Sequence, residues 1–160
     1  MLASGRLAVA RSLLSLGLGM QPEPLQSSPF PLDAEAPRVV VADSDEMLRT
    51  GIARMLAARG YDVVVLRTGA QLLQYLYNEG MREGRPDLVI CGAELEGIDG
   101  AQVCLIAHSQ DNLLPFIVMA REGEASEFDA LELLDDACVV KRPVDLDELN
   151  DVVVELAGEP

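Results

Sequence analysis

Polar residues that stand beside apolar runs of the chain are the ones whose side chains could share a reactive site. Asp43 and Ser44 directly follow the run RVVVA (Arg38–Ala42), and Arg142 precedes Pro143 after a later run. A carboxylate in such a place can bind a hard cation or pair with a guanidinium group. Which chemistry holds depends on the elements that bring these residues together.

Five short apolar runs separated by helical patterns are expected to position these residues. The runs are RVVVA at 38–42, YDVVVL at 61–66, DLVIC at 87–91, PFIVMA at 115–120 and ACVV at 137–140. They are apolar throughout, which is typical of parallel strands buried on both faces. Five such strands alternating with five helices predict an α/β fold with a doubly wound, five-stranded parallel sheet. Sites in such sheets form at the carboxyl ends of the strands. The informative residues are therefore Asp43, Ser44, Gly92, Met119, Ala120 and Arg142.

The helices are indicated by apolar residues spaced three or four positions apart. Ser44 or Asp45 is expected to cap the first helix, and Gly60 to end it. The residues assigned to helices are Leu48, Ile52, Met55 and Leu56; Leu72, Leu73, Leu76 and Tyr77; Val103, Leu105 and Ile106; and, on the inner face of the last helix, Leu146, Leu149, Val152, Val153 and Leu156. The fourth helix, at about 124–134, is strongly acidic.

Charge and composition narrow the classes of partner. The formal net charge is −15, and 49% of the residues are hydrophobic although Trp is absent, so the core must be aliphatic. An acidic surface repels nucleic-acid phosphates and anionic lipids. We therefore expect protein partners and no contact with nucleic acid or membrane. No apolar run approaches the ~18 residues of a membrane span.

The three cysteines, Cys91, Cys104 and Cys138, are expected to be buried free thiols. Their number is odd, their spacing matches no zinc pattern, and each has apolar neighbours. Free thiols favour a reducing, cytoplasmic setting.

Residues 1–36 are interpreted as a flexible N-terminal extension and linker, and residues 37–158 as one domain. The first 18 residues contain Arg6 and Arg11 but no acid, and the stretch that follows is rich in Pro, which favours an extended linker. A signal peptide is disfavoured because no clear cleavage site follows the apolar run. A transit peptide, or a true start at Met20, stays open.

Three segments resemble the receiver domain of two-component response regulators. They are RVVVADSDEMLRTGIARMLAARGYDVVVLRTG, RPDLVICGAELEGIDG and VVKRPVDLDEL, in the order and at the spacing typical of that family. The resemblance covers residues 38–156 and implies the family's flavodoxin-like (βα)5 fold and a role in phosphorelay signal transduction. In the family, an acidic pair and a phosphoacceptor Asp hold Mg²⁺, while a Ser or Thr and a Lys contact the phosphoryl group.

By that resemblance, the chain departs from the family at most of the acidic and hydroxyl positions. Asp43 keeps the first acid, whereas Ser44 fills the second acidic position. The phosphoacceptor position falls on Gly92, which has no side chain, and the hydroxyl position falls on Met119. The resemblance therefore implies a degenerate receiver, or pseudo-receiver, that lacks the phosphoacceptor.

The fifth strand departs from the family pattern as well. The position of the family Lys falls on Arg142, directly before Pro143, or on Lys141 if the register shifts by one. Cys138 or Val139 stands where the family has an aromatic residue.

With one acid left, a direct pair between Asp43 and Arg142 is favoured over a ligand-binding site, since Arg is the better bidentate partner of a carboxylate. Mg²⁺ is not expected, and Asp43 would be at most a weak metal ligand. Asp45, Glu94 and Asp99 could rebuild a metal site, but solvated loop acids are the favoured interpretation.

Two further features have a plain and a functional interpretation. His108 is interpreted as a surface helix histidine, because the chain has no second His for a phosphorelay pair. The acidic helix at 124–134 is interpreted as a solvated face, with partner binding as the alternative.

We therefore predict a non-enzymatic, phosphorylation-independent protein-interaction module in two-component signalling. Its partner would be a histidine kinase or another signalling protein, and a homodimer stays open. The alternative is a functional receiver that a histidine kinase phosphorylates at a non-standard residue such as Asp43 or Asp99. An unrelated flavodoxin-like binding module is the third interpretation, disfavoured because no Gly-rich loop follows the first strand.

Overall fold

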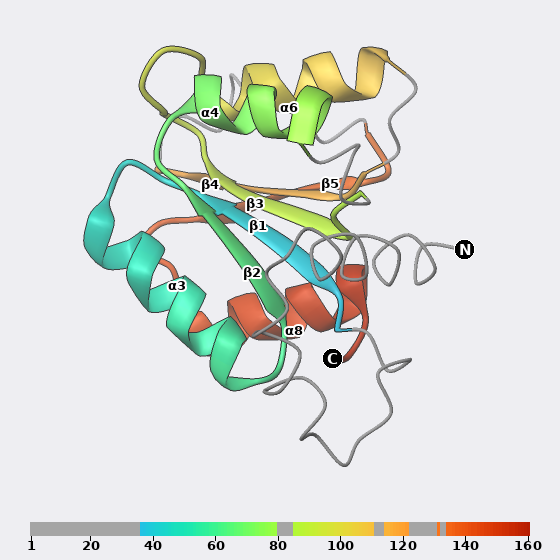
Figure 1. The fold of residues 1–160 in the computed structure, drawn as a ribbon. Helices are drawn as coiled ribbons and strands as arrows, with labels where there is room; N and C mark the ends of the chain where they lie inside the picture. Colours follow the sequence, from blue (N-terminus) through green and yellow to red (C-terminus); the bar gives the residue numbers. More distant parts are fainter. Residues whose placement is uncertain (1–35, 80–84, 111–113, 122–130, 132–133) are drawn as a thin grey trace, which may run out of the picture.

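A computed structural model of the chain describes residues 36–79, 85–110, 114–121, 131 and 134–160. Its centre is a parallel sheet in the order β2-β1-β3-β4-β5. The strands are β1 (Arg38–Ala42), β2 (Asp62–Leu66), β3 (Leu88–Gly92), β4 (Phe116–Ala120) and β5 (Ala137–Lys141). The predicted doubly wound α/β fold is confirmed (Figure 1).

Helices cover both faces of this sheet. Helix α3 (Glu46–Ala58) and helix α8 (Leu146–Ala157) lie on one face. Helix α4 (Gly69–Gln74), the π-helical turn η1 (Tyr75–Glu79) and helix α6 (Gly100–Ser109) lie on the other face (Figure 1). The three inner strands are therefore buried on both sides, as their continuous apolar runs require.

Carboxylates cap the two helices of the first layer. The side chain of Asp45 accepts hydrogen bonds from the N–H groups of Met47 and Leu48 at the start of α3. Asp145 does the same at the start of α8. Such caps satisfy backbone donors that the helix itself leaves free. Gly60, with a φ of 104°, follows α3 and turns the chain towards β2.

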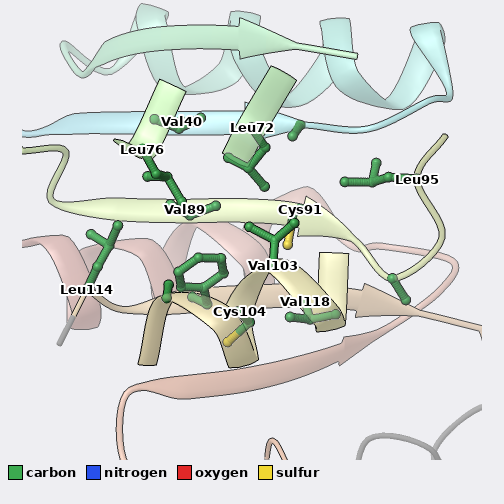
Figure 2. Packing of buried hydrophobic residues seen from close by; sticks show 14 of the residues in the cluster. Val40, Leu72, Leu76, Val89, Cys91, Leu95, Val103, Cys104, Leu114 and Val118 are labelled. Carbon is green, nitrogen blue, oxygen red and sulfur yellow. The ribbon is translucent and has the colours of Figure 1, made fainter. Parts of the chain in front are cut away.

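Two aliphatic clusters, one on each side of the sheet, form the core. The cluster under α4 and α6 contains Val40, Val89 and Val118 from the strands and Leu72 and Val103 from the helices (Figure 2). The cluster under α3 and α8 contains Ile52, Leu56, Leu149 and Val153. Both clusters are mainly aliphatic, as the composition predicted, and Tyr61, Tyr75 and Phe116 are the aromatic residues that join them.

The structure corrects several details of the sequence prediction. Strand β3 begins and ends one residue later than predicted, so that Gly92 is its last residue. The predicted second helix changes into a π-helical turn at Tyr75. Leu146, predicted on the inner face of the last helix, is 36% exposed. Cys138 is only half-buried, because β5 is an edge strand.

Some predicted features lie outside the described residues or are only partly tested. Residues 1–35 of the predicted N-terminal extension lie outside them, and so does most of the acidic fourth helix, of which Leu131 is described and buried. Within the described part of the chain, no helix is long and apolar enough to cross a membrane.

Candidate functional site

Asp43 and Arg142 meet at the carboxyl ends of the strands. Nη2 of Arg142 lies 2.6 Å from Oδ2 of Asp43, in the pair that the sequence predicted. The side chain of Asp43 is 1% exposed and that of Arg142 is 21% exposed. Lys141, the alternative cation, is the exposed last residue of β5. The residue directly before Pro143 is therefore the one that faces Asp43.

Every oxygen atom of Asp43 accepts a hydrogen bond. Oδ1 accepts from the backbone N–H of Asp45 at 2.8 Å, and Oδ2 accepts from Arg142. The carbonyl oxygen accepts from Nη1 of Arg49 at 2.7 Å. A buried carboxylate is stable only when its charge is compensated in this way.

The ion pair extends over the end of β3. Strands β3 and β4 lie between β1 and β5, so the side chains that follow β1 and β5 must reach across the sheet to meet. A Cβ atom placed on Gly92 would lie 2.6 Å from Oδ2 of Asp43 and 2.9 Å from Nη2 of Arg142. Both distances are too short for real Cβ contacts. The ion pair therefore occupies the space that a side chain at position 92 would need.

A shallow cavity of about 70 Å³ opens beside the pair. Its lining residues are Asp43, Ser44, Asp45, Ala93, Glu94, Met119, Arg121 and Arg142. Met119 is fully buried at the end of β4, and its carbonyl accepts the N–H of Ala93 at 2.8 Å. Neither Met119 nor Ala120, the last residue of β4, has a hydroxyl group. The site thus offers exposed acids and arginines around one buried ion pair.

The residues present do not fit a Mg²⁺ ion. Such an ion prefers several oxygen ligands in octahedral geometry. Here both carboxylate oxygens of Asp43 are already hydrogen-bonded, one of them to a cation, and Oδ1 of Asp45 caps α3. Among the described residues, no three His, Cys, Asp or Glu side chains are grouped as metal ligands.

The other acids that the sequence analysis named have different roles in the structure. Glu94 is exposed at the rim of the cavity. Asp99 is the N-cap of α6, where Gln102 accepts its backbone N–H in a capping box. The structure therefore brings Asp45 and Glu94 near Asp43 and gives Asp99 a capping role.

The cysteines do not add a nucleophile to the site. Burial, together with Cys104 and Asp43, raises the pKa of the Cys91 thiol well above its usual value. Burial also raises the pKa of Cys104 to about 12. Thiolates are the reactive form of cysteine, so both groups are inert thiols at neutral pH. Cys91 and Cys104 are buried free thiols, as predicted.

His108 is not the plain surface residue that the sequence predicted. Its ring lies 5.9 Å from that of Phe116, centroid to centroid. Nδ1 lies 2.9 Å from the carbonyl oxygen of Cys104, which fixes the ring against its own helix. The side chain is therefore part of the packing under α6 and does not line the cavity at the strand ends.

Sequence reasoning missed two arginines near the site. Arg49 is 8% exposed and holds the backbone of Asp43, and Arg121 lines the cavity. A signal for Arg49 was present, because it shares the inner helical face of Ile52 and Leu56 at spacings of three and seven. A cation at an inward position indicates a buried acceptor.

Comparison with known proteins identifies the family of this chain. The family model described as "Response regulator receiver domain" matches residues 39–154. AfsQ1 of Streptomyces coelicolor, a transcriptional regulatory protein, is 31% identical over 105 residues, which are 66% of this chain and 44% of AfsQ1. The DNA-binding response regulator MtrA of Mycobacterium tuberculosis is 31% identical over 93 residues, 58% of this chain and 38% of MtrA. The chain thus spans less than half the length of these curated relatives.

Solved structures support the same fold. A response regulator receiver protein from Pseudomonas putida has a TM-score of 0.67 at 23% identity, covering 76% of this chain and 98% of that one. A putative response regulator from Chloroflexus aurantiacus has a TM-score of 0.66 at 24% identity, covering 78% and 100%. The family model matches well over half of the chain, and the sheet order is that of a doubly wound fold. The chain therefore belongs to the response regulator receiver domain family and to two-component signalling.

Proposed function

We propose that this receiver domain signals without phosphorylation and acts through contacts with other proteins. The observation that carries the proposal is the ion pair over Gly92. In place of a free carboxylate at the end of β3, the structure has the Asp43–Arg142 pair, whose atoms would lie 2.6 Å and 2.9 Å from a Cβ at position 92.

Phosphoryl transfer to a carboxylate needs a nucleophile, a charge-neutralising cation and donors for the new phosphoryl oxygens. Gly92 supplies no nucleophile. The carboxylate of Asp43 is buried and bound on both oxygens, which disfavours attack by it. Met119 and Ala120 supply no hydroxyl donor. The lack of these groups supports a domain whose conformation is not switched by phosphoryl transfer.

The alternative is phosphorylation at a non-standard residue. Asp99 is exposed, but its place as the N-cap of α6 ties it to the helix, and the described residues place no cation beside it. Asp43 would have to release Arg142 before it could react. These features support the phosphorylation-independent interpretation over this alternative.

The partner that we propose is a histidine kinase or another signalling protein. MtrA is named a DNA-binding protein, yet only 38% of MtrA aligns with this chain. The net charge of −15 disfavours phosphate backbones as direct partners. The absence of nucleic-acid contact therefore stays a prediction for this chain.

Intact-mass spectrometry of the full chain after incubation with acetyl phosphate and Mg²⁺ tests the proposal. We expect no phosphoryl adduct at a concentration and time that saturate a receiver with an intact acidic site. An adduct in good yield would overturn the proposal. Asp43→Asn and Asp99→Asn, treated in parallel, would then show which carboxylate carries the group.

A further inference from the structure

The outer surface of α4, η1 and α6 has no charged side chain in residues 69–78 and 100–107. We call the exposed side chains of residues 69–78 and 100–109 the α4–α6 face. It contains no Asp, Glu, Lys or Arg and consists of Ala70, Gln71, Gln74, Tyr77, Asn78, Gln102, Leu105, Ile106 and Ser109. In a chain with a net charge of −15, nine exposed positions without an acid or a strong base are unexpected. The opposite layer differs, since α8 alone carries Asp147, Glu148, Asp151 and Glu155.

Helix α6 is apolar on two sides but is covered on only one. Its inner side buries Val103, Cys104 and Ala107 against the sheet. Its outer side exposes Leu105 by 41% and Ile106 by 37%. A helix that is apolar all round is normally buried all round. The outer side of α6 is therefore suited to a protein contact.

The exposed apolar residues of η1 and α6 are neighbours on this face. Tyr77 of η1 is 41% exposed, and its hydroxyl donates to the carbonyl oxygen of Ile106 at 3.5 Å. Figure 1 shows α4 and α6 side by side on the same side of the sheet. An aromatic residue and two aliphatic residues, surrounded by Gln, Asn and Ser, match the charge-depleted centre of protein interfaces.

We propose that the α4–α6 face binds a second copy of this chain. Two copies that each carry a charge of −15 repel one another wherever acidic surfaces meet. The α4–α6 face is where a second copy can approach without bringing acids together. A basic partner, by contrast, would be drawn to the acidic surfaces. A two-fold dimer would place the same face of both copies in contact.

The area of the α4–α6 face limits the expected affinity of the dimer. Ten helical residues extend about 15 Å, and two neighbouring helices are about 10 Å apart. The face is therefore smaller than the roughly 800 Å² that each partner buries in a standard interface. We expect a weak dimer whose population rises with protein concentration and with salt, because salt screens the repulsion between copies.

Analytical ultracentrifugation of the full chain at several protein concentrations, in low and high salt, tests this proposal. The variant is Gln74→Glu with Gln102→Glu, which adds two negative charges to the face with almost no change in shape. Gln102 accepts the N–H of Asp99 through Oε1, an interaction that Glu preserves. We expect the variant to raise the dimer dissociation constant at least tenfold.

The matched control is Met47→Glu with Arg54→Gln on α3. It changes the net charge by the same amount, and both residues are exposed on the opposite layer. We expect the control to dimerise like the wild-type chain. A chain that stays monomeric in high salt overturns the proposal, and so does equal weakening by the two variants. Self-association does not depend on phosphoryl chemistry, so this proposal and the proposed function can fail separately.

Discussion

The strand ends and the α4–α6 face differ in where charged side chains are found. At the ends of β1 and β5, a buried carboxylate is held 2.6 Å from a partly exposed guanidinium group, with a further arginine bound to the backbone beside them. On the α4–α6 face, exposed positions that tolerate any charge carry neither an acid nor a lysine or arginine. The first region holds charged groups where burial raises their free energy. The second has no charged group although exposure to water would make one nearly neutral for stability.

This difference separates a structural role from a binding role. A buried ion pair stabilises only as a pair, so its members fix the positions of β1 and of the loop after β5. An exposed uncharged face adds little to stability, so its composition points to what touches it from outside. Changes at the strand ends should therefore act on folding, and changes on the face should act on association.

Arg142→Gln is expected to have the largest effect on stability. It leaves the carboxylate of Asp43, which is 1% exposed, without its cation, at a cost on the order of 3 kcal/mol. Urea unfolding followed by circular dichroism measures the loss. A loss below about 0.5 kcal/mol, typical of exposed pairs, would place the two charges outside the core of the site.

Asp43→Asn is expected to destabilise less than Arg142→Gln. The arginine that it strands is 21% exposed and can turn towards water, whereas the carboxylate of Asp43 cannot. The double variant should be no worse than Arg142→Gln alone, because the two losses come from one interaction. Additive losses in the same unfolding measurement would mean that the groups do not interact.

Gly92→Ala should destabilise by about 1–2 kcal/mol, because overpacking forces nearby groups to move. The new methyl would lie 2.6 Å from Oδ2 of Asp43 and 2.9 Å from Nη2 of Arg142. The loss should shrink in the Arg142→Gln background, where Asp43 is free to rotate. An unfolding free energy equal to that of the wild-type chain would show that position 92 has room that the ion pair does not fill.

Added Mg²⁺ is expected to change the stability of the chain less than any of the substitutions at the strand ends. A ligand of the native state adds RT ln(1 + [L]/Kd), so ~10 mM Mg²⁺ acts only if Kd is near or below that concentration. Since both carboxylate oxygens of Asp43 are occupied, we expect no change in melting temperature. A rise of several degrees that Asp43→Ala abolishes would contradict the ion-pair interpretation.

On the α4–α6 face, the Gln74→Glu and Gln102→Glu variant should unfold within about 0.5 kcal/mol of the wild-type chain, as surface substitutions usually do. Urea unfolding at a protein concentration too low for dimers measures the free energy of unfolding of the single chain, without a contribution from association. A loss of several kcal/mol would mean that the face is packed within the chain itself, and the contrast between the two regions would fail.

Local pattern determined most of the fold and part of the site. Continuous apolar runs indicated buried parallel strands, and the spacing of Ile52, Leu56, Leu149 and Val153 indicated the inner faces of α3 and α8. The family resemblance, with only one acid left in the site, predicted the pair of Asp43 and Arg142, and both residues follow strands whose carboxyl ends share one edge of the sheet. These inferences succeed because secondary structure is encoded over a few residues, and the parallel direction of the strands follows from their alternation with helices.

Tertiary structure alone decided the rest, because it concerns distances between residues far apart in the chain. That the pair fills the space above Gly92 follows from β3 lying between β1 and β5, which sequence spacing does not measure. The pattern also did not separate Val103 from Leu105 and Ile106, since α6 is apolar on both sides. Only the packing of α6 on the sheet decided which of these residues are buried and which two are left exposed beside Tyr77.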